Sequence, residues 1–434
     1  MTRQKTSRSL RSLGMTVALA TASTVAAQSA PLTAVRFGSL VDGSGHVTRD
    51  AVVVVSADTI VSVGTGASAV PRGARVIDMR RYTGIPGLID AHTHITYYWD
   101  KTPGTDPWQQ SGRRRSQVTV FLAQENARRT LETGVTTIRD LGASEYSDLA
   151  IRDLINRGAM VGPRVYAAGY GLRRAPGNAQ PNALPGPPRG RLASVDDVPA
   201  AVKAQVDAGA DVIKVYGSTG SAADVTGRQT LTYEEMKAIV EASHALGKRV
   251  AIHSYGPDGG RDAVRAGAES VEHPIDLDDS TFALMVAQGT YYVPTIDHNR
   301  YYAEYAKDFN YSAAQVGGLD SFRLRNIETA RRAFKAGVKF AMGSDAVFHM
   351  FGENTRELGW YTQIGMTPAQ ALATATTNGA ALLGLEKKLG AVARGYFADI
   401  VAVEGDPHAD IKVVIDKVRW VMKGGQVVVD KTRR

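Results

Sequence analysis

The sequence predicts an α/β protein, a (β/α)8 barrel accompanied by a small β-sandwich domain that is built from both ends of the chain. Three observations support this fold class. The middle of the chain alternates short apolar strand candidates with amphipathic helix candidates eight times. Both ends are instead rich in valine and punctuated by glycine, which is typical of short paired strands. Several strand candidates of the middle part also end in His, Lys or Asp.

Length and composition are compatible with this architecture. A chain of 434 residues with 44% hydrophobic content can bury a large core, and an α/β barrel can absorb most of that length as one domain. No apolar run approaches the roughly 20 residues of a membrane span, so we expect no membrane partner. The net charge of +8 is misleading, because four of the 51 basic residues lie in the first dozen positions. The remainder is nearly balanced and gives little reason to expect nucleic acid binding.

Residues 1–27 have the pattern of a cleaved secretory signal. A basic start is followed by a short apolar run at 15–20 and by the small residues Val25-Ala26-Ala27. The alternative is a disordered N-terminal extension. We predict cleavage after Ala27 and a secreted or periplasmic location. The absence of cysteine agrees with an oxidising compartment and excludes a disulfide framework.

The predicted β-sandwich domain comprises residues 28–82 and 390–434. The valine-rich texture of the two segments is similar, so one small domain made from both is the economical interpretation. Gly424-Gly425 is a hairpin-turn candidate between the last two strands. The expected strands are residues 51–55, 59–63 and 75–79 in the first segment, and 399–403, 418–422 and 426–429 in the second.

Residues 83–389 form the predicted barrel. The expected strands end at residues 89–92, 137–140, 165–168, 212–215, 250–253, 270–273, 292–295 and 340–343, with helices at 117–133, 233–246 and 321–336 among those between them. An open doubly wound sheet is not favoured, because no glycine-rich phosphate loop follows the first strand. Long connections at 99–116, 170–193 and 297–315 are expected at the C-terminal rim, where active sites of this fold lie.

Four of the nine histidines stand at the ends of predicted strands. His92 and His94 are two residues apart, so in a strand their side chains point the same way and can face one ion. His253 and His273 each close a later strand, and Asp345 follows the last one. Each of these residues alone could be a satisfied side chain at the rim. Together they predict a metal centre.

Lys214 indicates which type of centre this is. It lies in an apolar strand, where an unpaired charge is costly. One resolution is an ion pair with an inward acid such as Asp345. The other is a neutral amine that has taken up carbon dioxide, forming a carbamate that bridges two cations. The readily shifted pKa of lysine makes the neutral form accessible.

These motifs resemble the metal-dependent amidohydrolase superfamily over nearly the whole chain. Lys214 and the segment His253-Ser254-Tyr255-Gly256 are similar to the branch of Xaa-Pro dipeptidases and carboxypeptidase-like amidohydrolases. Ochratoxin-degrading enzymes belong to that branch, and imidazolonepropionase is a relative. The resemblance is carried by residues 86–94, Lys214, His253, His273, Gly343-Ser344-Asp345 and 395–401.

The resemblance implies two divalent metal ions, which we expect to be zinc, and a carbamate on Lys214. His92, His94 and Asp345 would hold one ion, His253 and His273 the other, and carboxylated Lys214 would join both. Two cations sharing a water lower its pKa and give a metal-bridging hydroxide. Asp345 would pass the proton of that nucleophile to the departing nitrogen. Tyr255 would help to stabilise the oxyanion or serve only in packing.

Cationic and aromatic side chains of the rim predict the substrate. An arginine fork suits a carboxylate, and aromatic rings such as Tyr97 suit an apolar side chain. We therefore expect cleavage of an amide next to a C-terminal carboxylate, in dipeptides, N-acyl amino acids or ochratoxin-like amides. Alternatively, the arginines are solvated or lie in a contact of the expected homo-oligomer. The candidate substrate-binding residues are Tyr170, Arg173, Arg174, Tyr216, Tyr255, His298 and His349.

Other reactions fit the same metal ligands. A lactonase or esterase, a phosphotriesterase and an imidazolonepropionase-like cyclic amide hydrolase remain alternatives. Ring deaminases of the superfamily usually use one metal and no bridging lysine, so Lys214 argues against them. Relatives that keep the fold without catalysis have lost metal ligands, whereas all six ligand positions are filled here.

Overall fold

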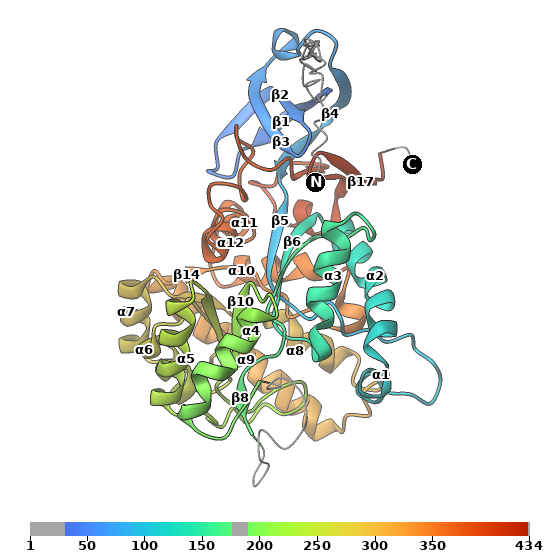
Figure 1. Cartoon of the computed structure of the whole chain (residues 1–434). Coiled ribbons are helices and arrows are strands. Elements are labelled where there is room, and N and C mark those ends of the chain that lie inside the picture. Colours follow the sequence, from blue (N-terminus) through green and yellow to red (C-terminus); the bar gives the residue numbers. More distant parts are fainter. Residues whose placement is uncertain (1–30, 176–189, 433–434) are drawn as a thin grey trace, which may run out of the picture. The chain divides into compact units, whose positions relative to one another are not determined.

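The computed structural model of the protein describes residues 31–175 and 190–432. The predicted signal segment lies outside these residues, as do residues 176–189 of the predicted connection 170–193. The described part is an α/β fold, in which strands from both chain ends lie together and helices surround a set of parallel strands (Figure 1). Within it, no helix combines the length and the apolar character that a membrane span requires.

The two ends of the chain share one seven-stranded sheet, with the strand order β17-β16-β15-β4-β1-β2-β3. β4 is the link, because it pairs in parallel with β1 and antiparallel with β15. The β domain assembled from both ends is thus present, but its described strands form one mixed sheet instead of the two sheets of the predicted sandwich. The strands are β1 (Leu32–Val41), β2 (Val47–Ser56), β3 (Thr59–Thr65), β4 (Arg75–Pro86), β15 (Ile400–Val403), β16 (Val418–Lys423) and β17 (Gln426–Asp430).

The valine run of β2 shows why this sheet is stable. Successive side chains of a strand point to opposite faces. Val53 and Val55 pack into the main core of this domain together with Trp420, whereas Val52 and Val54 pack on the other face. Both faces of β2 are therefore covered, which explains why its sequence is continuously apolar instead of alternating.

All eight strands predicted for the middle of the chain are present, in two parallel sheets. β5 (Leu88–Thr93), β6 (Val135–Asp140) and β7 (Arg164–Ala167) form the first. Figure 1 shows β5 leading away from the seven-stranded sheet directly after β4. The second sheet contains β10 (Val212–Tyr216), β11 (Arg249–His253), β12 (Ser270–Glu272), β13 (Tyr291–Val293) and β14 (Lys339–Phe340) in that order.

Backbone hydrogen bonds connect the two parallel sheets at both margins. Leu172 N–H donates to the Lys214 carbonyl at 2.8 Å, and Tyr216 N–H donates to the Leu172 carbonyl at 2.8 Å. On the other side, Asp345 N–H donates to the His92 carbonyl at 2.7 Å. Regular strand pairing does not run unbroken around all eight strands in the described ranges, so the predicted barrel is seen as two sheets with bridged margins.

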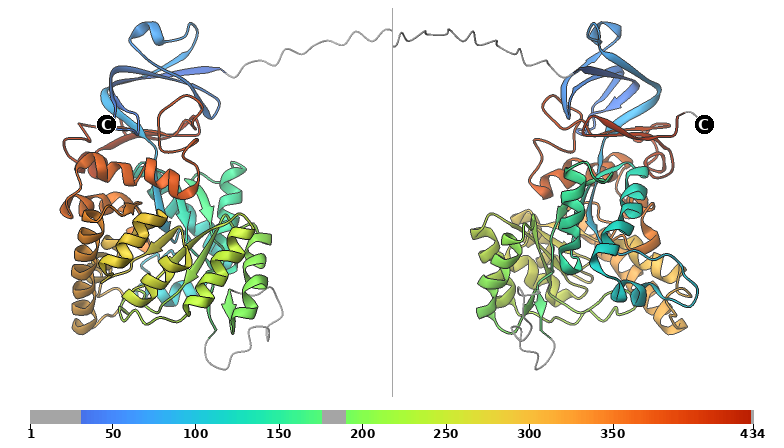
Figure 2. Two further views of the ribbon diagram at one scale, coloured as in Figure 1. Left: turned by 90° about the vertical axis from the view of Figure 1, so that its left-hand side faces the viewer. Right: turned by 45° about the vertical axis from the view of Figure 1, so that its right-hand side comes forward.

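Helices follow the parallel strands and lie on their outer side (Figure 2). Parallel neighbours require such crossover connections. The predicted helices 117–133 and 233–246 agree with α2 and α5, whereas 321–336 is the second half of the longer α9. The main helices are α2 (Ser116–Glu132), α3 (Ser147–Asn156), α4 (Val198–Asp207), α5 (Tyr233–Ala245), α6 (Pro257–Ala266), α7 (Asp279–Gln288), α9 (Ala313–Lys335), α10 (Glu357–Gln363), α11 (Pro368–Thr374), α12 (Thr377–Leu383) and α13 (Lys412–Asp416).

Two of the predicted long connections contain helices. The prediction of a loop at 297–315 was wrong for its first part, which is α8 (Ile296–Glu304). Residues 296–302 are all buried, so this helix has no polar stripe from which it could have been recognised. The connection 99–116 contains the short α1 (Pro107–Arg113), and the described ends of 170–193 pair as β8 (Arg173–Arg174) and β9 (Arg191–Leu192).

Candidate metal centre

The six predicted metal ligands meet at one place. Because parallel strands end at the same edge, side chains at their carboxyl ends converge. All six are buried, and they line one cavity of about 60 Å³. His92, Lys214 and His253 belong to β5, β10 and β11, while His94, His273 and Asp345 follow β5, β12 and β14.

The carboxylate of Asp345 lies at the centre of the cluster. Its oxygens are 3.3 Å from His94 Nε2 and 3.5 Å from His92 Nε2. They are also 3.4 Å from His298 Nε2 and 3.9 Å from His273 Nε2. Ligand atoms of His92, His273 and Asp345 lie within 4.8 Å of one another, which is close enough to hold one metal ion.

The other ring nitrogen of three of these histidines is anchored. His92 Nδ1 lies 2.8 Å from Glu272 Oε2, and His94 Nδ1 lies 3.1 Å from the Gly142 carbonyl. His298 Nδ1 lies 2.8 Å from the carbonyl of Asp345. Carboxylate and carbonyl oxygens only accept hydrogen bonds, so each Nδ1 must donate. In a neutral ring, Nε2 then carries the lone pair, and the three lone pairs converge on a carboxylate.

Burial favours the neutral form of most of these rings. It lowers the pKa of His92 to about 4, and it lowers the pKa values of His298 and His273 as well. His94 differs: burial alone would lower its pKa, but its hydrogen bond with Asp345 and the charges of Asp345 and Asp140 together raise it. Burial alone would raise the pKa of Asp345, but His298 and His92 hold it well below its ordinary value.

His253 adds a further nitrogen atom that could bind a metal ion. Its ring lies 4.9 Å from the His273 ring, and its Nε2 is buried without a hydrogen-bond partner among the described residues. Lone pairs and a carboxylate without hydrogens between them repel one another unless a cation lies between them. The donor set therefore fits divalent metal ions, and the anchored Nδ1 atoms are the usual way in which proteins orient such ligands.

Burial brings Lys214 closer to the neutral form that its predicted chemistry needs. The residue is 1% exposed, and burial lowers the pKa of its amine to about 8. Its Nζ lies 3.5 Å from His92 Nε2. Among the described residues no carboxylate lies within ion-pair distance of Nζ, so the alternative of an ion pair with Asp345 is not found.

The backbone around the centre is strained. His273, Thr295 and Asp345 have φ values of 59°, 48° and 52°, in the left-handed region. Such conformations cost about 1–3 kcal/mol each and are concentrated at functional sites. Gly343 permits the close approach of the last strand segment, because a Cβ at this position would lie 2.8 Å from the Cβ of His92.

A buried ion pair that supports His92 was not predicted from the sequence. Glu272 accepts from His92 Nδ1 with one oxygen, and its other oxygen lies 3.0 Å from a guanidinium nitrogen of Arg139. Burial alone would raise the pKa of Glu272, but Arg139 and His92 lower it to about 2. Arg139 also donates to the Ala91 carbonyl. The available signal was the pair of charged residues, Arg139 and Asp140, at the end of the predicted strand β6.

Asp90 was also missed, although it precedes the first histidine motif. It accepts from the Ser344 backbone at 2.9 Å and from the Ser344 hydroxyl at 2.6 Å. The Asn354 amide donates to it at 2.9 Å. Asp90 therefore ties the Gly343-Ser344-Asp345 segment to β5, which places Asp345 beside His92.

The predicted substrate-binding residues fall into two groups. Tyr216, Tyr255 and His298 line the cavity with the metal-binding side chains. Tyr97, Trp108 and Tyr302 line it too, and of these only Tyr97 had been singled out from the sequence. Arg173 is exposed, and its guanidinium lies 4.2 Å from the centre of the Tyr216 ring.

The remaining candidates lie apart from the cavity. The Tyr170 hydroxyl accepts from the Glu145 backbone, and the His349 ring packs 5.0 Å from the ring of Trp99. Arg174 forms an ion pair with Glu235, which offers both carboxylate oxygens to it. This guanidinium already has a carboxylate partner, and a role of Arg174 in substrate binding stays a prediction.

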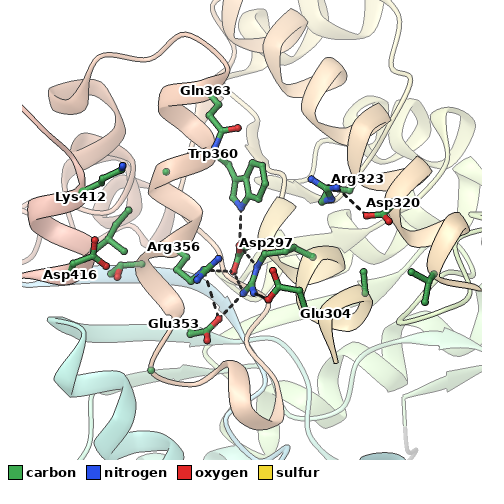
Figure 3. A pocket seen from close by; sticks show the side chains of 17 residues that line it. Asp297, Glu304, Asp320, Arg323, Glu353, Arg356, Trp360, Gln363, Lys412 and Asp416 are labelled. Atoms are coloured by element: carbon green, nitrogen blue, oxygen red, sulfur yellow. Dashed lines mark hydrogen bonds and ion pairs between the residues drawn. The ribbon is translucent and has the colours of Figure 1, made fainter. Parts of the chain in front are cut away.

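A larger cavity lies elsewhere, with a volume of about 860 Å³. Figure 3 shows Asp297 at its base, directed toward the indole of Trp360 and the guanidinium of Arg356. Arg300 donates twice to Asp297, at 2.8 Å each, and reaches Glu353 at 2.6 Å. None of the six predicted ligands lines it, so we assign the chemistry to the smaller cavity.

Fold and site together define a class: α/β enzymes in which histidines and a carboxylate gather at the carboxyl ends of parallel strands. Comparison with known proteins identifies the family. Residues 83–428 match the Amidohydrolase family. Over 429 residues the chain is 31% identical to ochratoxinase of Aspergillus niger, covering 92% of this chain and 87% of that protein.

Two further relatives agree with this family assignment. Imidazolonepropionase of Symbiobacterium thermophilum is 27% identical over 401 residues, covering 83% of this chain and 85% of that protein. The crystal structure of a Xaa-Pro dipeptidase with methionine bound in its active site is similar with a TM-score of 0.82 and 32% identity, covering 91% of this chain and 99% of that one. The chain belongs to the Amidohydrolase family. This confirms the predicted resemblance and a hydrolase acting on carbon–nitrogen bonds.

We predict that Glu272→Gln weakens metal retention without unfolding the protein. An amide cannot offer Arg139 and His92 the same charge, and loss of such supporting contacts typically costs 10–100-fold in metal affinity. Competition with a chromophoric chelator measures the affinity, and circular dichroism checks the fold. Glu241→Gln, at a side chain that is 66% exposed, is the matched control. Unchanged affinity in Glu272→Gln would refute the supporting role.

Proposed function

We propose that the protein is a binuclear-metal amidohydrolase that cleaves an amide bond next to a C-terminal carboxylate. The observation that carries this proposal is the convergence of imidazole lone pairs on the Asp345 carboxylate beside a buried, readily neutralised lysine. Ochratoxinase and a Xaa-Pro dipeptidase among the relatives support amide substrates. Dipeptides, N-acyl amino acids and ochratoxin-like amides are the proposed substrate class.

The candidate metal ligands divide into two sets, one for each ion. His92, His94 and Asp345 would hold one ion, His253 and His273 the second, and a carbamate on Lys214 would join both. Imidazole and carboxylate donors suit zinc. When bound, two such ions lower the pKa of a shared water and polarise the scissile carbonyl. The carbamate forms when neutral Nζ adds to carbon dioxide and loses a proton, and a lysine pKa of about 8 makes that amine available.

Side chains of the chain itself perform the remaining tasks. Asp345 is ionised and accepts the proton of the attacking water, which it then gives to the departing nitrogen. His298 donates from Nδ1 to the Asp345 carbonyl and thereby holds this residue in its left-handed conformation. Burial raises the pKa of Tyr255, so its hydroxyl keeps its proton and can donate to the developing oxyanion.

The cavity wall supplies specificity. Arg173 beside Tyr216 is placed to meet the substrate carboxylate. Tyr97 and Trp108 offer aromatic surface to an apolar side chain. Since Arg173 is exposed, its contribution is smaller than that of a buried arginine.

The proposal also covers the domains, the location and the assembly of the protein. We propose that the two bridged parallel sheets act as the (β/α)8 barrel of the family at residues 83–389, with the β domain at 28–82 and 390–434. Residues 1–27 would direct the protein to the periplasm or outside the cell, where it would act as a homo-oligomer on small molecules. Neither nucleic acid nor a membrane has a part in this function.

We expect chelation to abolish turnover and zinc to restore it. Purified enzyme should contain about two ions per chain, and Lys214→Ala should lose at least one of them together with nearly all activity. Elemental analysis and an amide-hydrolysis assay measure the two quantities. Lys203→Ala, at a side chain that is 64% exposed, is the control. Full activity in Lys214→Ala would exclude the carbamate bridge.

Asp345→Asn separates proton transfer from metal binding. Asparagine keeps the size and one oxygen donor but cannot accept the proton, so kcat should fall by more than about 10²-fold with substantial metal retained. Steady-state kinetics on metal-analysed enzyme gives both values. A kcat equal to that of the wild type would contradict the assignment.

The carboxylate requirement is tested with N-acetyl-phenylalanine and its carboxamide. Loss of a charge-assisted hydrogen bond to an exposed arginine should lower kcat/KM by about tenfold. Arg173→Ala should remove most of the difference between the two substrates. Equal kcat/KM values for both substrates in the wild type would replace the carboxypeptidase-like assignment with a broader amidase or lactonase.

A further inference from the structure

The cavity at the metal-binding side chains is too small for the proposed substrates. Its volume of about 60 Å³ has room for roughly four waters. Sites for organic ligands typically measure roughly 300–1,000 Å³. An amide with a side chain on each side of the scissile bond must therefore extend into further space.

Such space lies directly beside it. A second cavity of about 250 Å³ shares two of its lining residues, Tyr97 and Trp108, with the cavity at the metal centre. The two volumes together reach the lower end of the usual range for ligand sites. The second cavity is formed by residues that follow β5 and β6 and by α1 and α2.

The partition between the cavities consists of aromatic side chains. The rings of Tyr97 and Trp108 meet edge to face, with centroids 6.1 Å apart. Tyr97 stacks on the ligand candidate His94 at 4.9 Å, and Trp108 packs on Phe348 at 5.1 Å. Side chains can change rotamer without a change of backbone. A substrate that turns the indole aside would reach from one cavity into the other.

The second cavity is chemically different from the first. A guanidinium, Arg114, lies in its wall and donates to the Tyr98 carbonyl at 2.9 Å. The Ser111 hydroxyl is shielded from solvent and has no hydrogen-bond partner among the described residues. Buried hydroxyl groups are usually hydrogen-bonded, so a polar atom of a ligand would be a suitable partner for Ser111. Six serine and threonine side chains line this cavity: Thr96, Ser111, Ser116, Thr119, Ser144 and Ser147.

We propose that this hydroxyl-lined cavity is a distal subsite for a polar group on the acyl side of the scissile amide. This inference rests on the proposed function, in which Arg173 and Tyr216 hold the carboxylate on the other side. The favoured substrates are then peptides or acyl amino acids whose acyl part carries hydroxyl or amide groups, because these donate and accept with the lining hydroxyls.

Three substrates test the subsite: N-acetyl-phenylalanine, N-acetyl-seryl-phenylalanine and N-acetyl-leucyl-phenylalanine. For the wild type, kcat/KM should be about tenfold higher for the seryl substrate than for either of the others, which corresponds to one or two net hydrogen bonds. Thr119→Trp fills the cavity and should bring the ratio of seryl to short substrate to about one. Val118→Trp, at the neighbouring 45% exposed position of α2, should keep the wild-type ratio.

Ser111→Ala gives a second readout that does not depend on a bulky side chain. It should lower the preference for the seryl substrate by about two- to tenfold. Two outcomes would overturn the subsite alone. In the first, the wild type hydrolyses the short substrate and shows no preference for the seryl substrate. In the second, the wild type, Thr119→Trp and Ser111→Ala all show the same preference for the seryl substrate. Failure of wild-type, zinc-loaded enzyme to hydrolyse any of the three would overturn the proposed function and the subsite with it.

Discussion

Lone pairs held together without hydrogens between them are the constraint on which this structure depends. Three imidazoles are fixed through Nδ1 by groups that can only accept, and burial favours the neutral form of two of them, His92 and His298, so their Nε2 atoms face the Asp345 carboxylate as acceptors. This arrangement is unfavourable unless a cation joins it. The surrounding protein has to hold these groups in place, and the buried pair of Arg139 and Glu272 does so for His92, whose Nδ1 donates to Glu272.

The same constraint explains the strained backbone. Asp345 and His273 have positive φ values because each must turn its side chain from the end of a strand toward the centre. Asp90 holds Ser344, the residue before Asp345, with two hydrogen bonds, and a third joins Asp90 to Asn354. The strained conformation of Asp345 is thus held in place by the buried carboxylate of Asp90, which is not itself one of the candidate metal ligands.

The sequence allowed the strands and the ligand candidates to be predicted because both leave local signals. An apolar run that ends in histidine or aspartate, such as the segment before His253, shows its role within a few residues. Helix α8 gave no such signal, since Asp297, His298, Asn299 and Arg300 are polar or charged and yet buried, so its polar residues do not mark a solvent-exposed face. The pairing of Arg174 with Glu235 could not be predicted from the sequence, because the two residues are 61 positions apart and meet only in the folded protein.

Helix α8 places consecutive residues in two different environments. Asp297 belongs to the ion-pair network of the large cavity, whereas His298 faces Asp345 at the metal centre. Substitutions in the first turn of α8 are therefore expected to be poorly tolerated, since a displacement of this turn would move residues at both sites. The short helix α1 carries Trp108, which lines the two adjoining cavities, and none of the six ligand candidates. Laboratory evolution of new substrate ranges should find its adaptive changes around α1, while α8 accumulates few of them.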